Sequence, residues 1–223
     1  MKNIQKNIKK LKQKITNISK KFKINTQKIK LLAVSKNRSV NDIKKAILCG
    51  QNSFGENYVQ ESQPKIKLFN NIEWHYIGQI QSNKAHIIAK NFSWCHTITN
   101  KKTAVLLNKY RPYSLPKLNT LIQINIRDNT INIDDDIETI KQLAKTINSL
   151  DNLNLRGIMA MPYFKNTYLE QIQSYKYIHL YFDILKKKYT YIDTVSLGTS
   201  HDIQAALYSG STLLRIGSSI FDV

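Results

Sequence analysis

The sequence predicts a closed (β/α)8 barrel, an α/β TIM-barrel fold formed as a single domain over residues 1–223. Eight short apolar or β-branched segments recur along the chain, segments with helical periodicity lie between most of them, and no linker rich in Pro, Gly or Ser divides them. Such alternation indicates parallel strands joined by right-handed crossovers, and eight units in one domain favour closure. An open doubly wound sheet is the alternative. The predicted strands are 31–35, 52–54, 74–77, 94–98, 119–126, 154–158, 192–196 and 213–216.

The first predicted element is an amphipathic helix that precedes the barrel strands. Its apolar positions are spaced by four and three residues in turn, which places them on one helical face. Residues 1–30 hold eleven lysines and no acid. A transit peptide is also acid-poor but would favour Arg and Ser, so we interpret this segment as a structural helix with a solvated lysine face. The apolar positions are Ile4, Ile8, Leu11, Ile15, Ile18 and Phe22.

Further helices are predicted between the strands. Ser39 precedes one of them, with Asp42 three positions later in an approximate capping box. The acidic run 134–136 falls at the predicted start of another, where carboxylates suit the helix macrodipole. The predicted helices are 40–48, 83–89, 137–147 and 168–188.

Composition predicts a soluble, folded chain with a strong basic excess. Hydrophobic residues make up 42% of the sequence, and no apolar run approaches the roughly 18 residues that a membrane span needs. The 34 basic and 15 acidic residues give a net charge of +19, which would suit a nucleic-acid partner. However, Lys, Asn and Ile are enriched together throughout the chain, which indicates compositional drift more than a shaped patch. We therefore do not expect nucleic-acid binding.

The cysteines and histidines indicate neither a disulfide framework nor a metal site. Cys49 and Cys95 are far apart, without a CxxC motif or a nearby histidine cluster. A reducing cytoplasm fits this usage. The histidines show no metal-ligand spacing, so we interpret each as a packing or surface residue. They are His75, His86, His96, His179 and His201.

The unusual residues of the chain follow the predicted strands. In a (β/α)8 barrel, functional side chains collect at the carboxyl ends of the strands, because those loops form one open face. Residues far apart in the sequence would therefore face one another there. The residues in question are Lys36, Gly55, Glu56, Asn57, Gly78, Met159, Met161, Gly198, Ser200, Arg215, Gly217 and Ser218.

Lys36 ends an apolar strand, and its position predicts unusual chemistry. Burial there would partly desolvate the ammonium group and lower its pKa, leaving a neutral amine that can form a Schiff base with an aldehyde. The alternatives are that Lys36 extends to solvent or pairs with Glu56.

Two turns of small residues, 198–200 and 217–219, each follow a predicted strand near the end of the chain. Backbone N–H groups at such turns bind phosphate, and the hydroxyls of Ser200 and Ser218 can add donors. TIM barrels often place a phosphate site after strands seven and eight. An aldehyde-reactive lysine together with a phosphate cradle indicates pyridoxal 5′-phosphate (PLP) as the cofactor.

Arg215 lies between those two turns. A guanidinium that donates to the pyridine nitrogen of PLP would keep that nitrogen unprotonated and make the ring a poorer electron sink. The alternative is that Arg215 pairs with a carboxylate at the barrel mouth.

Five stretches between about residue 30 and residue 221 resemble, in order, the successive motifs of the pyridoxal phosphate homeostasis proteins. They are LLAVSKNRSVNDIKKAILCGQNSFGENYVQE, WHYIGQIQSNK, LIQINI, LRGIMAMP and VSLGTSHDIQAALYSGSTLLRIGSSIF. Proteins of that family are single-domain barrels similar to the N-terminal domain of alanine racemase. The resemblance therefore implies the same barrel, with PLP as its cofactor.

The resemblance also implies which residues contact PLP. The lysine of the AVSK motif, which holds the cofactor as an internal aldimine in that family, is Lys36 here. Asn57 falls where the family lines the cofactor pocket, and Arg215 falls where a residue is expected to face the pyridine nitrogen. The implied phosphate contacts are Ser200, Gly217 and Ser218.

The sequence departs from the family pattern at three places. Thr199 stands where a methionine is usual, the segment after Ile126 lacks the usual SKSG-like sequence, and the chain stops at Val223 where a glycine is usual. The first departure could slightly alter the phosphate turn, and the second weakens any role for the loop after Ile126.

The sequence predicts a PLP carrier that moderates the free cofactor concentration in intracellular vitamin B6 homeostasis, without substrate turnover. Racemisation needs a base on each face of the substrate, and alanine racemase obtains the second base from an additional domain and a dimer partner, which we do not expect here. Tyr58 or Tyr163 could substitute, although aromatic residues near a barrel mouth more often pack.

The alternatives are a PLP-dependent amino-acid racemase or lyase and a basic nucleic-acid binder. The expected partners are PLP itself and, transiently, PLP-dependent apoenzymes. We expect a cytoplasmic monomer with no membrane contact.

Overall fold

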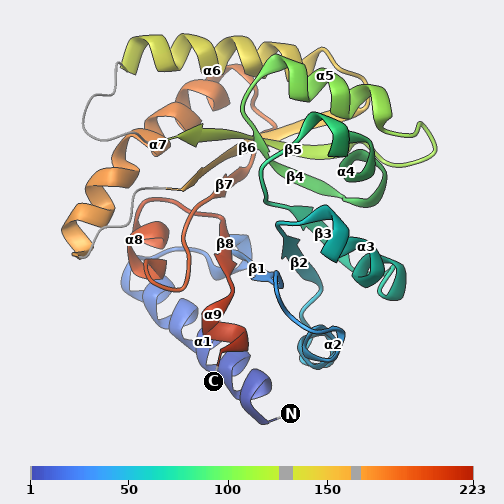
Figure 1. Cartoon of the computed structure of the whole chain (residues 1–223). Coiled ribbons are helices and arrows are strands. Elements are labelled where there is room, and N and C mark those ends of the chain that lie inside the picture. The colour runs from blue at the N-terminus through green and yellow to red at the C-terminus, as the bar shows by residue number, and fades with distance from the viewer. Residues whose placement is uncertain (1, 126–132, 162–166, 223) are drawn as a thin grey trace.

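The computed structural model describes residues 2–125, 133–161 and 167–222, which form a closed barrel of eight parallel strands (Figure 1). Each strand pairs with its neighbours in chain order, and the barrel closes where β8 pairs with β1, with Lys30 opposite Leu213 and Ala33 opposite Ile216. The predicted barrel is confirmed, and the open sheet is wrong. The strands are β1 (Lys30–Val34), β2 (Ser53–Glu56), β3 (Glu73–Tyr76), β4 (Trp94–Ile98), β5 (Leu118–Asn125), β6 (Leu153–Met161), β7 (Thr194–Ser196) and β8 (Leu213–Ile216).

Helices surround the barrel, and all four predicted between strands are present as α2, α4, α6 and α7. α3 and α5 were not predicted. In α3 the pattern is weakened by Pro64, which sits inside the helix. The helices are α1 (Lys2–Lys21), α2 (Val40–Leu48), α3 (Val59–Leu68), α4 (Ala85–Asn91), α5 (Lys101–Tyr110), α6 (Ile133–Asn148), α7 (Tyr168–Lys188), α8 (Ile203–Tyr208) and α9 (Ser218–Phe221).

The start of α2 is capped as its sequence predicts. The Oγ of Ser39 accepts a hydrogen bond from the backbone N–H of Asp42 at 3.2 Å and donates to the carboxylate of Asp42 at 2.7 Å. α6 begins at Ile133, directly before the acidic run 134–136. The side chains of that run lie outside the described residues, so their effect on the macrodipole stays a prediction.

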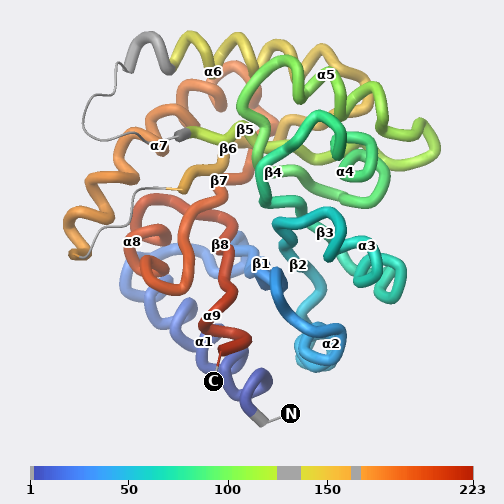
Figure 2. Tube along the Cα trace, in the orientation of Figure 1, coloured from blue at the N-terminus to red at the C-terminus, as the bar shows by residue number. Residues whose placement is uncertain are grey.

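α1 packs against the end of the chain. Five of the six predicted apolar positions are buried, whereas Phe22 follows the helix and is half-buried. α1 lies beside α9, as Figure 2 shows for the blue and red ends of the trace. The Asn7 side chain donates to the backbone oxygens of Ile220 at 3.1 Å and Asp222 at 3.2 Å. α1 is therefore a structural element that supports α9 and the turn before it. The buried residues of α1 include Ile4, Ile8, Leu11, Ile15 and Ile18.

The main hydrophobic core lies between the strands and the surrounding helices. Trp94, Leu121 and Met159, from three adjacent strands, form a separate small cluster. Several polar side chains are fully buried beside them, including His75 and His96. Cys49 and Cys95 are free thiols. None of the described helices is long and apolar enough to cross a membrane.

Candidate functional site

The carboxyl ends of the strands surround a cavity of about 380 Å³. Its size lies within the range usual for small-molecule sites. All six predicted site residues line it, although they come from four separate stretches of the chain. They are Lys36, Asn57, Ser200, Arg215, Gly217 and Ser218.

Lys36 lies two residues beyond the end of β1, at the rim of this cavity. Its side chain is exposed, so the prediction that the protein partly desolvates the ammonium group is wrong. The reason is that β1 ends at Val34, and the buried environment of the strand ends with Ser35. Lys36 forms no hydrogen bond or ion pair with the residues that the structure describes. Its amine is therefore available to a ligand.

The backbone on both sides of Lys36 is held by a buried ion-pair cluster. The ammonium of Lys65 donates to the backbone oxygen of Ser35 at 2.8 Å and to the carboxylates of Glu56 at 2.8 Å and Glu61 at 2.6 Å. Glu61 also accepts from the backbone N–H of Asn37 at 2.7 Å, where φ is +58°.

Glu56 is thus the partner of Lys65, and the alternative pairing with Lys36 is wrong. Burial raises the pKa of the Glu56 carboxyl, whereas hydrogen bonds from Lys65 and Ser35 oppose that rise.

Asn57 follows β2 and lines the cavity with an unused hydrogen-bond acceptor. Its Oδ1 atom is buried and has no hydrogen-bond partner among the described residues. Such an atom is costly unless a ligand or water satisfies it. Gly78 makes room for this strand exit, because a Cβ at residue 78 would lie 2.0 Å from the backbone oxygen of Asn57.

The two small-residue turns are joined directly. The Oγ of Ser200 accepts a hydrogen bond from the backbone N–H of Ser219 at 3.1 Å. Ser218 begins α9, so its own N–H has no partner inside that helix. The turns therefore form one continuous rim of hydroxyl and N–H groups along the cavity.

Asp202, which the sequence analysis did not single out, fixes the first of these turns. Its Oδ1 accepts from the backbone N–H of Thr199 at 2.6 Å and from the Thr199 hydroxyl at 2.8 Å. The hydroxyl of Thr199 is thus used within the turn. Gly198 adopts φ of +92° and packs closely on Ala206, so glycine is required there.

Arg215 forms the buried floor of the cavity. Its guanidinium donates to the backbone oxygens of Ser196 at 2.6 Å and Ala160 at 2.9 Å, and to the Ser196 hydroxyl at 2.8 Å. It forms no ion pair with a carboxylate in the described part of the chain, so the alternative role at the mouth is wrong. Burial lowers the pKa of Arg215, yet a guanidinium remains protonated at neutral pH.

Among the described residues that line the cavity, one side chain is acidic. Asp222 pairs with Arg38, which follows Lys36 closely in the sequence and lines the same cavity. This pairing offsets the negative charge that Asp222 would otherwise present to an anionic ligand. Sequence reasoning missed the pair because its members are 184 residues apart.

Comparison with known proteins places the chain in a family. The model of the alanine racemase N-terminal domain family matches residues 1–223. A pyridoxal phosphate homeostasis protein of Buchnera aphidicola from Schizaphis graminum is 49% identical over 99% of this chain and 98% of the relative. The protein of that name in Escherichia coli K12 is 42% identical over 99% of this chain and 97% of the relative. The chain belongs to the pyridoxal phosphate homeostasis proteins.

Solved structures share the fold of this family member. PipY of Synechococcus elongatus, a structure with PLP bound, has a TM-score of 0.82 and 24% identity, covering 98% of this chain and 99% of PipY. An alanine racemase of Clostridium difficile has a TM-score of 0.70 and 15% identity, with 99% of this chain covering 59% of the racemase. At these identities the likeness concerns the barrel alone.

The two tyrosines considered as substitute bases differ in what the structure describes. Tyr58 is 54% exposed, and no tyrosine is among the described residues that line the cavity. Tyr163 and the segment 126–132 lie outside the described residues.

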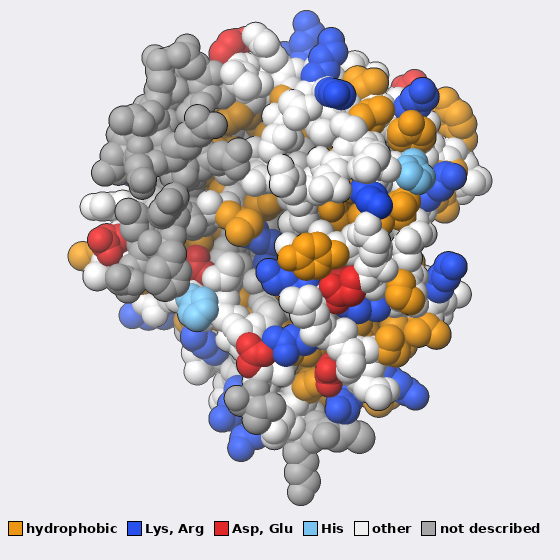
Figure 3. All heavy atoms as spheres, in the orientation of Figure 1, with side chains coloured by type: hydrophobic (Ala, Val, Ile, Leu, Met, Phe, Trp, Pro, Cys, Tyr) orange, Lys and Arg blue, Asp and Glu red, His pale blue; other side chains and the backbone are white. Residues whose placement is uncertain are grey.

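Lys and Arg side chains on the described part of the face in Figure 3 are scattered rather than gathered in one stripe.

Proposed function

We propose that this protein binds PLP reversibly in the cavity at the carboxyl ends of the strands, through a Schiff base to Lys36, and moderates the free concentration of the cofactor. The observation that carries the proposal is one cavity that combines the unpaired amine of Lys36 with the joined turns at Ser200 and Ser218. The names of the relatives, and the bound PLP in PipY, support the same ligand.

The residues present fit PLP at each of its polar ends. An aldehyde suits the Lys36 amine, and a phosphate suits the hydroxyl and N–H groups of Ser200, Gly217 and Ser218. The buried Oδ1 of Asn57 lacks a partner among the described residues and can accept a hydrogen bond from the ligand. PLP supplies an aldehyde and a ring that can withdraw electrons.

Arg215 would limit that electron withdrawal. Because the guanidinium is a permanent donor, it can donate to the pyridine nitrogen but cannot give that nitrogen its proton. This feature favours holding the cofactor over turning over an amino acid. We further propose that the protein acts as a cytoplasmic monomer and passes PLP to apoenzymes in transient contacts.

The test is the visible absorption spectrum of purified protein mixed with PLP. We expect the wild type to show the absorption of a Schiff base and Lys36→Ala to lose it, and borohydride should fix the cofactor to a peptide containing Lys36. Lys90→Ala, which removes an exposed lysine outside the cavity, serves as the matched control and should behave like the wild type. A wild type that takes up no PLP would refute the proposal.

Carrier and enzyme are separated by isotope exchange. The loaded protein is incubated with a panel of amino acids in deuterated water, and the Cα deuterium content is measured. We expect no incorporation above that produced by free PLP. Incorporation that depends on Lys36 would instead establish a racemase or lyase.

A further inference from the structure

The floor of the cavity is connected to a buried chain of polar side chains. Arg215 donates to the Ser196 hydroxyl at 2.8 Å, and that hydroxyl lies 3.2 Å from Nδ1 of His96. Ser196 belongs to β7 and His96 to β4, two strands that are not neighbours in the barrel. Their contact therefore crosses the barrel interior.

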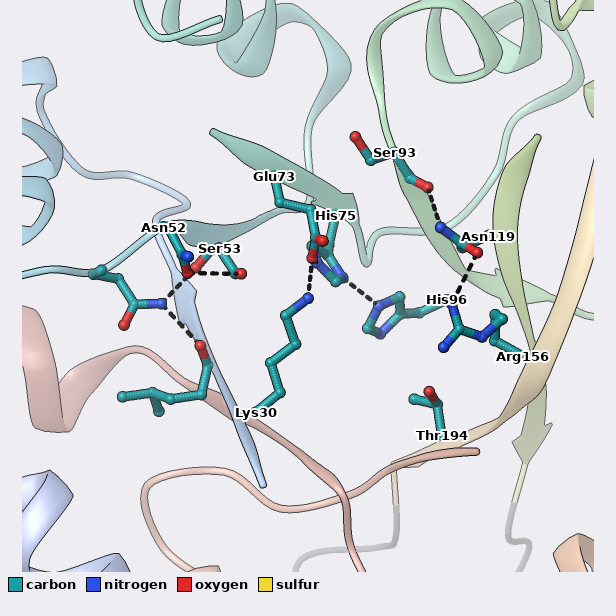
Figure 4. A network of polar contacts seen from close by, with 12 residues as sticks. Lys30, Asn52, Ser53, Glu73, His75, Ser93, His96, Asn119, Arg156 and Thr194 are labelled. Atoms are coloured by element: carbon teal, nitrogen blue, oxygen red, sulfur yellow. Dashed lines mark hydrogen bonds and ion pairs between the residues drawn. The ribbon is translucent and has the colours of Figure 1, made fainter. Parts of the chain in front are cut away.

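This series of buried polar side chains continues to the opposite face of the barrel (Figure 4). Nε2 of His96 lies 2.8 Å from Nδ1 of His75, and Nε2 of His75 lies 2.5 Å from the carboxylate of Glu73. Glu73 also pairs with Lys30. Glu73 and Lys30 begin β3 and β1, so they lie at the amino ends of the strands, away from the cavity. The histidines are fully buried, whereas the Glu73 side chain is 36% exposed.

A permanent donor at one end of this series, Arg215, and an ionised acceptor at the other, Glu73, determine the direction of every hydrogen bond between them. The guanidinium of Arg215 can only donate, so the Ser196 oxygen accepts and its hydroxyl hydrogen is free to reach Nδ1 of His96. His96 then carries its proton on Nε2 and donates to Nδ1 of His75. His75 in turn carries its proton on Nε2 and donates to the Glu73 carboxylate. The reverse order would set an unprotonated His75 nitrogen against the ionised carboxylate.

The surroundings keep both histidines neutral, as this order requires. Burial lowers the pKa of His75 to about 4, although the carboxylate of Glu73 opposes that change. Burial also lowers the pKa of His96, and the positive charges of Arg215 and Lys30 act in the same direction. The ring of His75 stacks on Trp94 with centroids 5.1 Å apart, which fixes its plane.

We propose that Glu73 is a remote positioning residue for Arg215: its negative charge fixes the direction of the hydrogen bonds through His75, His96 and Ser196, and so holds the guanidinium at the cavity floor in one arrangement. In Glu73→Gln, the side-chain amide could either accept a hydrogen bond from His75 or donate one to it. Both directions of the hydrogen bonds between residue 73 and Ser196 would then be allowed. The proposal rests on the proposed function only where PLP affinity is measured. The measurement of the histidine tautomers does not depend on PLP binding.

The first measurement uses the protein without PLP. Long-range ¹H–¹⁵N spectra of the imidazole nitrogens at pH 7 report which nitrogen of His75 and of His96 is protonated. We expect Nε2–H on both rings in the wild type and a second tautomer in Glu73→Gln. Asp193→Asn is the matched control, because Asp193 also pairs with a cation, Arg156, that lies over Trp94, but has no described hydrogen-bonded path to Arg215. Identical tautomers in Glu73→Gln and the wild type would overturn the proposal.

The second measurement is PLP affinity. Loss of one ordered hydrogen bond predicts roughly fivefold weaker binding in Glu73→Gln, no change in Asp193→Asn, and recovery in Glu73→Asp, which keeps the charge. Unchanged affinity in a folded Glu73→Gln protein whose tautomers have changed would overturn the positioning role, and so would an equal loss in Glu73→Asp.

A wild type that binds no PLP would refute the proposed function instead. The tautomer measurement would still test whether Glu73 fixes the direction of the buried hydrogen bonds. If Glu73→Gln does not fold, Glu73→Asp with wild-type tautomers supports the proposal, and Glu73→Asp with mixed tautomers contradicts it.

Discussion

One of the groups that hold the segment carrying Lys36 is a buried ammonium group, that of Lys65. Lys65 is 4% exposed and contacts both the backbone of Ser35 and two carboxylates, of which that of Glu56 is fully buried. Removing one member of such a cluster leaves an uncompensated buried charge, which costs more than the pair contributes. The geometry of Lys36 is thus tied to an interaction outside the cavity.

Replacement of this ammonium group should destabilise the protein more than replacement of the whole pair. We expect Lys65→Met to lower the free energy of unfolding by about 3 kcal/mol, because it leaves the buried Glu56 carboxylate without a partner charge. The double variant Glu56→Gln/Lys65→Met should lose less, since no charge then remains buried at that position. Chemical denaturation measures both, and a double variant at least as unstable as Lys65→Met would contradict this account.

Local sequence patterns revealed which residues reach the cavity but not how each is held there. Asn57 directly follows β2 and Lys36 lies two residues after β1, so the barrel rule alone places both near the open face. The exposure of Lys36 was missed because the end of an apolar run does not reveal where the strand itself stops. Asp202 and Lys65 lie in the segments after the strands, where nothing in the spacing marks them as partners of site residues.

Among the elements, α1 shows how a surface helix can belong to the core of the fold. Its lysine-rich sequence suggested either a structural helix or a targeting segment. The structure shows its apolar face buried beside α2, α8 and α9, and Asn7 hydrogen-bonded to the end of α9. The helix thereby supports the turn that contains Ser218.

Truncation of an apolar side chain of α1 should therefore destabilise the whole protein. Leu11 is 4% exposed, and we expect Leu11→Ala to lower the free energy of unfolding by about 3 kcal/mol through lost burial and the cavity left behind. The exposed neighbour Lys12 provides the control, and Lys12→Ala should change stability by less than about 0.5 kcal/mol. Equal stabilities of the two variants would show that α1 is only loosely attached.

Sequence periodicity predicted some helices and missed others of similar length. α2 and α7 have the predicted bounds. α3 contains Pro64, and α8 and α9 are too short for a repeat to stand out. All eight strands were predicted, because each contains apolar, aromatic or β-branched residues, although β2 and β3 also include charged ones.

For the whole molecule, barrel closure creates contacts that no local pattern contains. The hydrogen-bonded side chains from Arg215 to Glu73 join β8, β7, β4 and β3 across the interior. In the sequence, the two histidines among them look like ordinary packing residues. Only the closed arrangement of strands brings them together, so sequence alone could not order them into a network.

This buried network predicts how global stability depends on pH. The pKa of His75 is about 4 in the folded protein and near 6.5 in the unfolded chain. Between these values the unfolded state binds more protons, so stability falls as pH falls. We expect His75 alone to account for a loss of about 2 kcal/mol between pH 7 and pH 5.

Denaturation curves at the two pH values measure this loss. His86→Gln, which changes an exposed histidine, should leave the pH dependence as in the wild type. A free energy of unfolding that stays constant from pH 7 to pH 5 would mean that His75 is accessible to protons in the native state.

The close approach of Gly78 to the carbonyl of Asn57 restricts how this barrel can be redesigned. With only 2.0 Å available, even a methyl group would push aside the strand exit that presents the Asn57 amide. A mutant library intended to change ligand preference should leave that glycine untouched. Diversity belongs instead at Ile77 and Met161, whose side chains border the same opening.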